Sequence, residues 1–174
     1  MIDFPDLRQI DEYDCGITTA QAILAYYGFN LNHTEIARKL TVTKDEGVYP
    51  SSLVNLYREL GLETDAFSNS SIEGLKKRIR RGYPVQILIQ AWPGLNKEKN
   101  WESLDRDGHY VVAIGMNGRG VTFEDPYIFG RMFLSFESLE KRWHHNFFGN
   151  KYVGYGISVI GEEHWSTDRV VDLS

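Results

Sequence analysis

Four polar residues have the types and the order that an acyl-transfer reaction at a thiol requires. Cys15 is the chain's one cysteine and stands at the head of a helical pattern, with Gln9 shortly before it. His109 comes directly before an apolar run, and Asp125 follows the next strand pattern. A thiolate attacks an acyl carbon, an imidazole transfers the proton, a carboxylate orients the imidazole, and an amide donates to the oxyanion. The set predicts Cys15 as nucleophile, His109 as base, Asp125 as orienting group and Gln9 as oxyanion donor.

The sequence around Cys15 favours a reactive thiol. Unpaired N–H groups and the helix dipole stabilise an anion at a helix start, so the thiolate is favoured there. Asp14 and Gly16 flank the cysteine, which indicates an exposed helix start that another backbone approaches closely. The alternative is a free cysteine that fills the core, because such cysteines are often buried.

The other three residues also have simpler interpretations. Gln9 alone is an ordinary polar surface residue, His109 is a histidine at the rim of a sheet, and Asp125 begins a turn. A regular hairpin that turns at residues 118–119 would set Asp125 opposite Val112 rather than His109. Contact between His109 and Asp125 therefore requires a bulge or a parting of the two strands.

The composition excludes several other classes of protein. The 174 residues suit one domain, and the net charge of -5 and the pI near 5.5 do not suit a nucleic-acid binder. One cysteine excludes an internal disulfide, and the acidic N-terminus lacks the apolar segment of a signal peptide. No apolar stretch reaches the roughly 20 residues of a membrane helix, so the expected location is the cytoplasm. Neither a phosphate-binding glycine loop nor metal-ligand spacing is present, so no cofactor or metal is expected.

Helical patterns fill the first half of the chain, and strand patterns fill most of the second. The expected helices span 15–27, 32–40, 50–60 and 70–82, with Ser70 capping the fourth, and a fifth spans 135–143. The expected strands span 62–67, 84–90, 110–116, 121–124, 131–134 and 151–160, and His144 and His145 are assigned to a polar loop. This order predicts an α+β fold, in which a helical N-terminal half packs on an antiparallel sheet. We expect one domain over residues 1–174, with 162–174 as a loose tail.

The stretch 91–108 is long for a loop in a compact domain and leads into His109. Such loops are usually functional, so we expect this one to border a substrate groove. Trp92 and Trp101 are candidates for the wall of the groove, and Tyr110, next to His109, is a third candidate substrate-binding residue. The alternative for the two tryptophans is that they pin the loop to the protein surface.

Longer motifs around these residues resemble one family of proteases. The segments Gln9-Ile-Asp-Glu-Tyr-Asp14-Cys15-Gly16 and Ile23-Leu-Ala-Tyr-Tyr27-Gly28 resemble the start of the bacteriocin-processing, double-glycine type cysteine peptidases. Gly108-His109-Tyr110-Val111-Val112 and Asp125-Pro126 resemble their His and Asp motifs. The resemblance implies a papain-like fold and catalysis by Cys15, His109 and Asp125, with an oxyanion hole assisted by Gln9.

The residues and the resemblance together predict a papain-like cysteine peptidase or amide hydrolase that acts on a peptide or protein. The resemblance implies cleavage after small residues. Neither a membrane domain nor a nucleotide-binding domain is recognised, so a stand-alone enzyme is expected. Two alternatives stay open: an acyl transferase or cyclising enzyme with the same triad, and a non-catalytic peptide-binding module. A binding module would have no need of all four polar residues.

Overall fold

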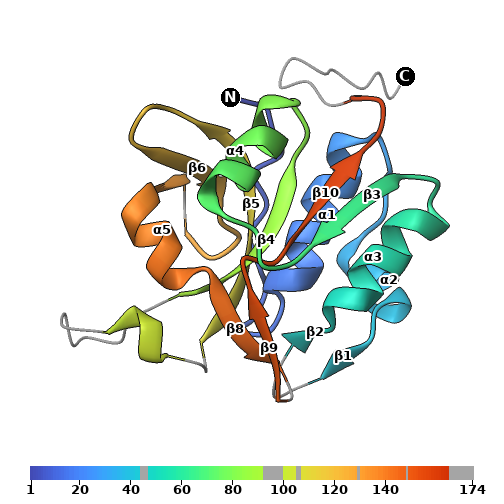
Figure 1. The fold of residues 1–174 in the computed structure, drawn as a ribbon. Helices are drawn as coiled ribbons and strands as arrows, with labels where there is room; N and C mark the ends of the chain where they lie inside the picture. Colours follow the sequence, from blue (N-terminus) through green and yellow to red (C-terminus); the bar gives the residue numbers. More distant parts are fainter. Residues whose placement is uncertain (44–46, 92–99, 105–106, 129, 148, 165–174) are drawn as a thin grey trace.

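The computed structural model of the chain describes residues 1–43, 47–91, 100–104, 107–128, 130–147 and 149–164. The described elements form three layers, in which a central antiparallel sheet has helices on both faces (Figure 1). The helices are α1 (Cys15–Tyr26), α2 (His33–Lys39), α3 (Pro50–Glu59), α4 (Ile72–Arg80) and α5 (Phe136–Arg142), with a short 3-10 helix η1 (Trp101–Ser103). The strands are β1 (Val42–Thr43), β2 (Gly47–Val48), β3 (Glu63–Phe67), β4 (Val85–Gln90), β5 (Gly108–Met116), β6 (Gly120–Glu124), β7 (Arg131–Ser135), β8 (His144–Phe147), β9 (Asn150–Val153) and β10 (Gly156–Ile160). The predicted α+β architecture is confirmed.

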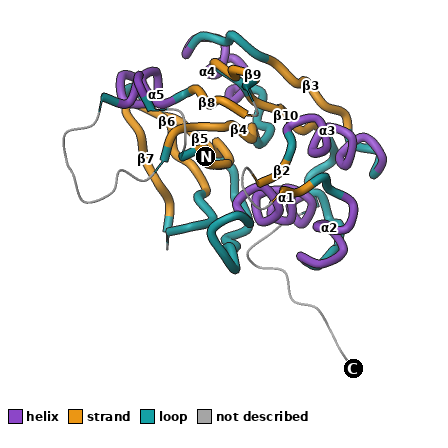
Figure 2. The backbone as a smooth tube through the Cα atoms, turned by 90° about the horizontal axis from the view of Figure 1, so that it is seen from below, coloured by secondary structure: helices purple, strands orange, loops and turns teal. Residues whose placement is uncertain are grey.

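The main sheet has the strand order β3-β10-β4-β5-β6-β7, and its neighbouring strands are antiparallel. β5 alternates its side chains between two cores. Tyr110, Val112 and Ile114 pack with residues of α1, α2 and α3, whereas Val111 and Ala113 pack with residues of α4 and α5. In Figure 2, α1, α2 and α3 accordingly gather on one side of β4 and β5, and α4 and α5 on the other. The apolar run of β5 is therefore continuous because both of its faces are covered.

Capping side chains explain where two of the helices begin. α2 has the capping box that its sequence predicts: Asn32 Oδ1 accepts from the N–H of Glu35 at 3.0 Å, and Glu35 accepts from the N–H of Asn32 at 2.8 Å. The cap of α4 is Ser71, whose hydroxyl accepts from the N–H of Gly74 at 3.2 Å, and not the predicted Ser70. The N–H of Ser70 instead bonds to the turn between β9 and β10, so α4 begins one residue later.

Residues 144–160 differ from the prediction. The predicted polar loop at His144 and His145 is strand β8, and the single predicted strand over 151–160 is two strands that belong to different sheets. The chain bends at Gly154, which has a φ of 54° and lies so close to the backbone of Ser70 that no side chain would fit. β9 therefore pairs with β8, while β10 enters the main sheet between β3 and β4.

The helices are short compared with the thickness of a membrane. α1 has 12 residues, and no helix in the described part of the chain combines the length and apolar character needed to cross a bilayer. Of the predicted tail, residues 165–174 lie outside the described residues. His164, just before them, donates its N–H to the carbonyl of Tyr26 at 3.1 Å, at the end of α1.

Candidate active site

Cys15 is the first residue of α1, and close packing holds it against the sheet. A side chain at Gly16 would come within 2.8 Å of Val48 and 3.2 Å of Tyr110, so the glycine lets the first helical turn press on β2 and β5. Cys15 is 8% exposed and Asp14 is 7% exposed. The helix start is therefore buried rather than exposed as its polar neighbours predicted. The carboxylate of Asp14 does not cap the helix but lies 2.9 Å from Nε2 of His33 on α2.

A chain of buried hydrogen bonds holds the first turn of α1 in place. The hydroxyl of Thr19 donates to the carbonyl of Cys15 at 2.7 Å and accepts from the amide of Gln86 on β4 at 2.7 Å. The hydroxyl of Tyr57 on α3 donates to the same amide at 2.8 Å. All three side chains are almost fully buried. Breaking one of these buried hydrogen bonds would leave a polar group unsatisfied in the core, at a cost in folding free energy. The intact network therefore fixes the backbone at Cys15.

His109 and Asp125 form a buried pair where β5 begins and β6 ends. His109 is the second residue of β5, and its Nε2 is 2.8 Å from Oδ1 of Asp125. The two residues are 5% and 0% exposed, respectively. The same oxygen of Asp125 accepts from the N–H of Tyr127 at 2.9 Å, which holds the carboxylate in place. Because Nε2 is engaged by the carboxylate, Nδ1 is the ring atom that can face the thiol.

The register of β5 and β6 explains how these two side chains meet. Next to the turn between β5 and β6 the two strands pair in the regular register, with Met116 opposite Val121. Further along, Ile114 on β5 has no partner, so that Val112 pairs with Glu124. In the regular register Val112 would pair with Asp125, on the face of the sheet opposite to His109. The bulge shifts the pairing by one residue and thereby brings Asp125 to the face that carries His109.

The charge state of His109 follows from its neighbours. Burial lowers the pKa of His109, because the interior disfavours the imidazolium, but this effect is overcome. Hydrogen bonds with Asp125 and Cys15, together with the charges of both, raise the pKa of His109 to about 9. The imidazole therefore holds its proton at neutral pH, and the resulting cation lies beside the sulfur of Cys15.

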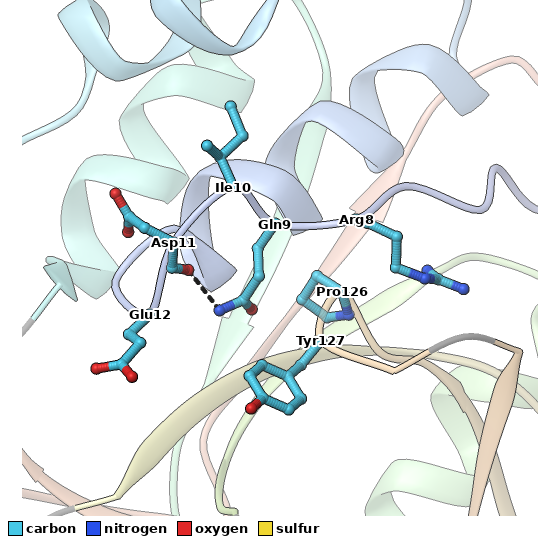
Figure 3. A pocket seen from close by; sticks show the side chains of 7 residues that line it. All are labelled: Arg8, Gln9, Ile10, Asp11, Glu12, Pro126 and Tyr127. Carbon is cyan, nitrogen blue, oxygen red and sulfur yellow. Dashed lines mark hydrogen bonds between the residues drawn. The ribbon is translucent and has the colours of Figure 1, made fainter.

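Gln9 lies on the segment that precedes α1, and this segment is attached to the turn after β6. The N–H of Gln9 donates to the carbonyl of Pro126 at 2.8 Å, and its side-chain amide donates to the carbonyl of Asp11 at 2.6 Å. Figure 3 shows the Gln9 side chain extending toward Asp11 and the Pro126–Tyr127 turn, at a pocket of about 300 Å³. The pocket is lined by Arg8, Gln9, Ile10, Asp11, Glu12, Pro126 and Tyr127. Gln9 thus lies on a segment that is hydrogen-bonded to the turn after Asp125 and that leads into Cys15.

The three predicted substrate-binding residues lie in different surroundings. Tyr110 is 3% exposed, and its hydroxyl donates to the carbonyl of Val48 at 3.1 Å, so it belongs to the core and not to a groove wall. Trp101 is half-buried on η1, where the guanidinium of Arg142 lies 4.1 Å from the centre of its ring. This contact joins η1 to α5 and matches the alternative in which Trp101 pins its loop. Trp92 lies outside the described residues.

Sequence reasoning missed a polar cluster behind His109. Gln90 is fully buried at the end of β4, where its amide donates to the carbonyl of His144 at 3.1 Å and accepts from the N–H of Asp107 at 3.3 Å. Nδ1 of His145 lies 3.2 Å from the same amide nitrogen. The ring of His145 covers Gly108 so closely that a side chain there would be 2.5 Å from Nε2. The signal for this cluster is a glutamine at the end of a mostly apolar run.

The model of the Peptidase_C39 like family matches residues 1–148. Among solved structures, the chain is similar to a protein of Bacillus anthracis described as C39-like, with 20% identity, a TM-score of 0.69, and coverage of 93% of this chain and 96% of that chain. It is also similar to the peptidase domain of Streptococcus ComA, a bifunctional ABC transporter involved in a quorum-sensing pathway, with 20% identity, a TM-score of 0.66, and coverage of 90% and 97%.

A third similar structure is a double glycine motif protease from an AMS/PCAT transporter in complex with the leader peptide. It shares 19% identity, with a TM-score of 0.63 and coverage of 90% of this chain and 91% of that chain. At these identities the similarity shows a common fold, which is that of C39 peptidase domains. A search of curated proteins finds no match.

Proposed function

The chain belongs to the Peptidase_C39 like family, and on that basis we propose that it is a cysteine peptidase that uses Cys15, His109 and Asp125. The observation that carries the proposal is the buried pair of His109 and Asp125, whose atoms Nε2 and Oδ1 are 2.8 Å apart. The hydrogen bond between His109 and Cys15 is the second support. A histidine that contacts a thiol on one side and a carboxylate on the other has the arrangement of a thiol protease.

The proposed reaction begins from a thiolate and an imidazolium. Sγ of Cys15 forms a bond to the carbonyl carbon, and the carbonyl oxygen becomes an oxyanion. When the carbon–nitrogen bond breaks, the imidazolium of His109 gives its proton to the leaving amine. The neutral imidazole then takes a proton from water as the water attacks the acyl-enzyme, and the carbon–sulfur bond breaks to return the thiolate. Asp125 holds the ring in place throughout and stabilises its cation.

Two N–H donors are proposed for the oxyanion. The first is the backbone N–H of Cys15, which is unpaired within α1 because it belongs to the first turn of the helix. The second is the side-chain amide of Gln9, whose nitrogen carries two hydrogens, one of which is taken by the carbonyl of Asp11. The backbone bond between Gln9 and Pro126 supports this assignment, because it ties the glutamine to the turn that follows Asp125.

The proposed substrate is a peptide with a small residue on the acyl side of the cleaved bond. Family membership supports this preference, as does the similar protease that carries a double glycine motif in its name and was solved with a leader peptide. A substrate groove that excludes bulky side chains by steric clash would discriminate strongly between peptides with small and with large residues before the cleaved bond. By comparison, one methylene group changes binding by only about 1–3 kcal/mol.

A peptide library tests both parts of the proposal. Peptides that vary at the residue before the cleaved bond are incubated with the wild type and with Cys15→Ser, and the products are identified by mass spectrometry. We expect cleavage after Gly, Ala and Ser by the wild type and none by the variant, which changes little volume and should stay folded. Cleavage by a folded Cys15→Ser protein would contradict the catalytic assignment. Equal cleavage after Leu or Phe would contradict the preference for small residues.

A further inference from the structure

A buried carboxylate next to the candidate site binds two arginines. The side chain of Glu124, at the end of β6, is 2% exposed, and its Oε1 lies 2.8 Å from a guanidinium nitrogen of Arg8. Its other oxygen pairs with Arg131 on β7. The two arginine side chains are themselves only 20% and 29% exposed. A carboxylate at such depth requires charged partners, so this cluster fixes the position of both arginines relative to β6.

The two arginines attach different parts of the N-terminal segment. Arg131 donates to the carbonyl of Phe4, well before the candidate site. Arg8 donates to the carbonyl of Asp125 at 3.4 Å in addition to its bond with Glu124. Arg8 therefore spans two successive residues of the chain, one of which supplies the carboxylate that contacts His109. Arg131 makes no such contact with Asp125 among the described interactions.

The residue after Arg8 is Gln9, and the residue after Asp125 is Pro126. These two are joined in turn, because the N–H of Gln9 donates to the carbonyl of Pro126 at 2.8 Å. Arg8 and Gln9 are thus joined to Asp125 and Pro126 at successive positions. Arg8 contacts Asp125 through its side chain, and Gln9 contacts Pro126 through its backbone N–H. In Figure 3 the side chains of Arg8 and Gln9 diverge from this segment, and the amide of Gln9 points toward the carbonyl of Asp11.

We propose that Arg8, held by Glu124, is a positioning residue for the oxyanion donor. The guanidinium fixes the backbone at Gln9 relative to Asp125, and through Asp125 relative to His109. The amide of Gln9 then stands at a set distance from the carbonyl that Cys15 attacks. This inference rests on the proposed function, because it assigns Arg8 a part in the acylation of Cys15 through Gln9.

Two reactions of Cys15 distinguish a positioning role from a general structural one. Acylation by a peptide thioester passes through an oxyanion and requires Gln9, whereas alkylation by iodoacetamide forms no oxyanion. We expect Arg8→Met to slow acylation by about tenfold or more, since losing an oxyanion donor outright costs about 100-fold to 1,000-fold. Alkylation at pH 7 should stay at the wild-type rate. Arg8→Lys keeps a cation next to Glu124 but loses the planar guanidinium, whose Nη1 contacts both Glu124 and the carbonyl of Asp125, so its acylation rate should fall between those of the wild type and Arg8→Met.

Arg131→Met is the matched control, because it also removes one cation from Glu124. Its acylation rate, measured on folded protein, should equal that of the wild type. A double-mutant cycle with Gln9→Ala completes the test: if Arg8 acts through Gln9, Arg8→Met should have no further effect on acylation once Gln9 is removed.

The outcomes separate the two levels of the argument. If Gln9→Ala acylates at the wild-type rate, the oxyanion assignment of the proposed function is wrong, and the role of Arg8 is wrong with it. If Gln9→Ala is slow but Arg8→Met and Arg8→Lys match Arg131→Met, only the positioning role is overturned. The same conclusion follows if Arg8→Met slows alkylation and acylation equally, because that result indicates general damage to the fold.

Discussion

Replacing Asp125 with asparagine should lower the pKa of His109 while leaving the fold intact. In the wild type this pKa is raised from 6.5 to about 9 against the opposing effect of burial, with the hydrogen bonds to Asp125 and Cys15 as the main causes. The difference corresponds to about 3 kcal/mol of preference for the imidazolium. An asparagine oxygen can still accept from Nε2 of His109 and from the N–H of Tyr127, but it brings no negative charge. The contribution of Asp125 to the shift should therefore be largely lost.

The same shift makes stability depend on pH with a definite sign. The folded pKa of His109 lies above its unfolded value, so its stabilisation is fully present below pH 6.5 and is lost as the pH rises through 9. Urea unfolding of the wild type should show this loss, up to about 3 kcal/mol, over that interval. In Asp125→Asn the loss should be smaller and should occur at lower pH.

The direct assay is an NMR titration of the His109 ring proton between pH 5 and pH 10. Asp65→Asn is the matched control, because Asp65 is a half-exposed carboxylate that pairs with Arg78 at 3.1 Å rather than with a histidine. We expect a wild-type midpoint near 9, a lower midpoint in Asp125→Asn, and no change in Asp65→Asn. A wild-type midpoint near 6.5, or equal midpoints in the wild type and Asp125→Asn, would refute the reasoning.

Three further predictions concern the surroundings of the pair. Iodoacetamide should alkylate Cys15 at pH 6–7 faster than it alkylates a free model thiol, because the imidazolium of His109 lies beside the sulfur; a rate that rises only after unfolding would support a merely buried cysteine. Gly108→Ala should destabilise the protein by about 1–3 kcal/mol in thermal unfolding, since its methyl would meet the ring of His145, whereas Gly118→Ala, where nothing lies within 4 Å, should have little effect. Trp101→Ala should weaken the attachment of η1 to α5 without changing the preference for small residues in the peptide library, and a changed preference would return Trp101 to the groove wall.

Much of the fold could be predicted because its signals are local. Asn32 and Glu35 form the capping box that their spacing indicates, and the apolar run at residues 110–116 is the buried strand β5. The order of helices and strands was sufficient to predict the α+β class. The predicted residues His109 and Asp125 also meet in space, although periodicity alone would have placed them on opposite faces of the sheet.

The features that sequence reasoning missed depend on contacts between distant segments. The bulge at Ile114 cannot be recognised in an apolar run whose faces are both buried, and its register shift brings Asp125 to the face of the sheet that carries His109. The polar histidines of β8 predict a loop, yet His145 is buried against Gly108 and the amide of Gln90. The position of Tyr110 after His109 predicts a place in the groove, but the side chain packs in the core, where its hydroxyl donates to the carbonyl of the distant residue Val48. Each error comes from a partner that lies far away in the chain.

The most direct test of the central claim is intact-mass spectrometry after incubation with an acylating thioester of a small peptide. The account predicts that the wild type gains the mass of one acyl group and that Cys15→Ala gains none. It also predicts that a folded His109→Gln protein is acylated much more slowly than the wild type. Acylation of Cys15→Ala to the same extent as the wild type, or a folded wild-type protein that neither gains mass nor releases the thiol of the thioester, would contradict the claim that Cys15 is the nucleophile of a cysteine peptidase.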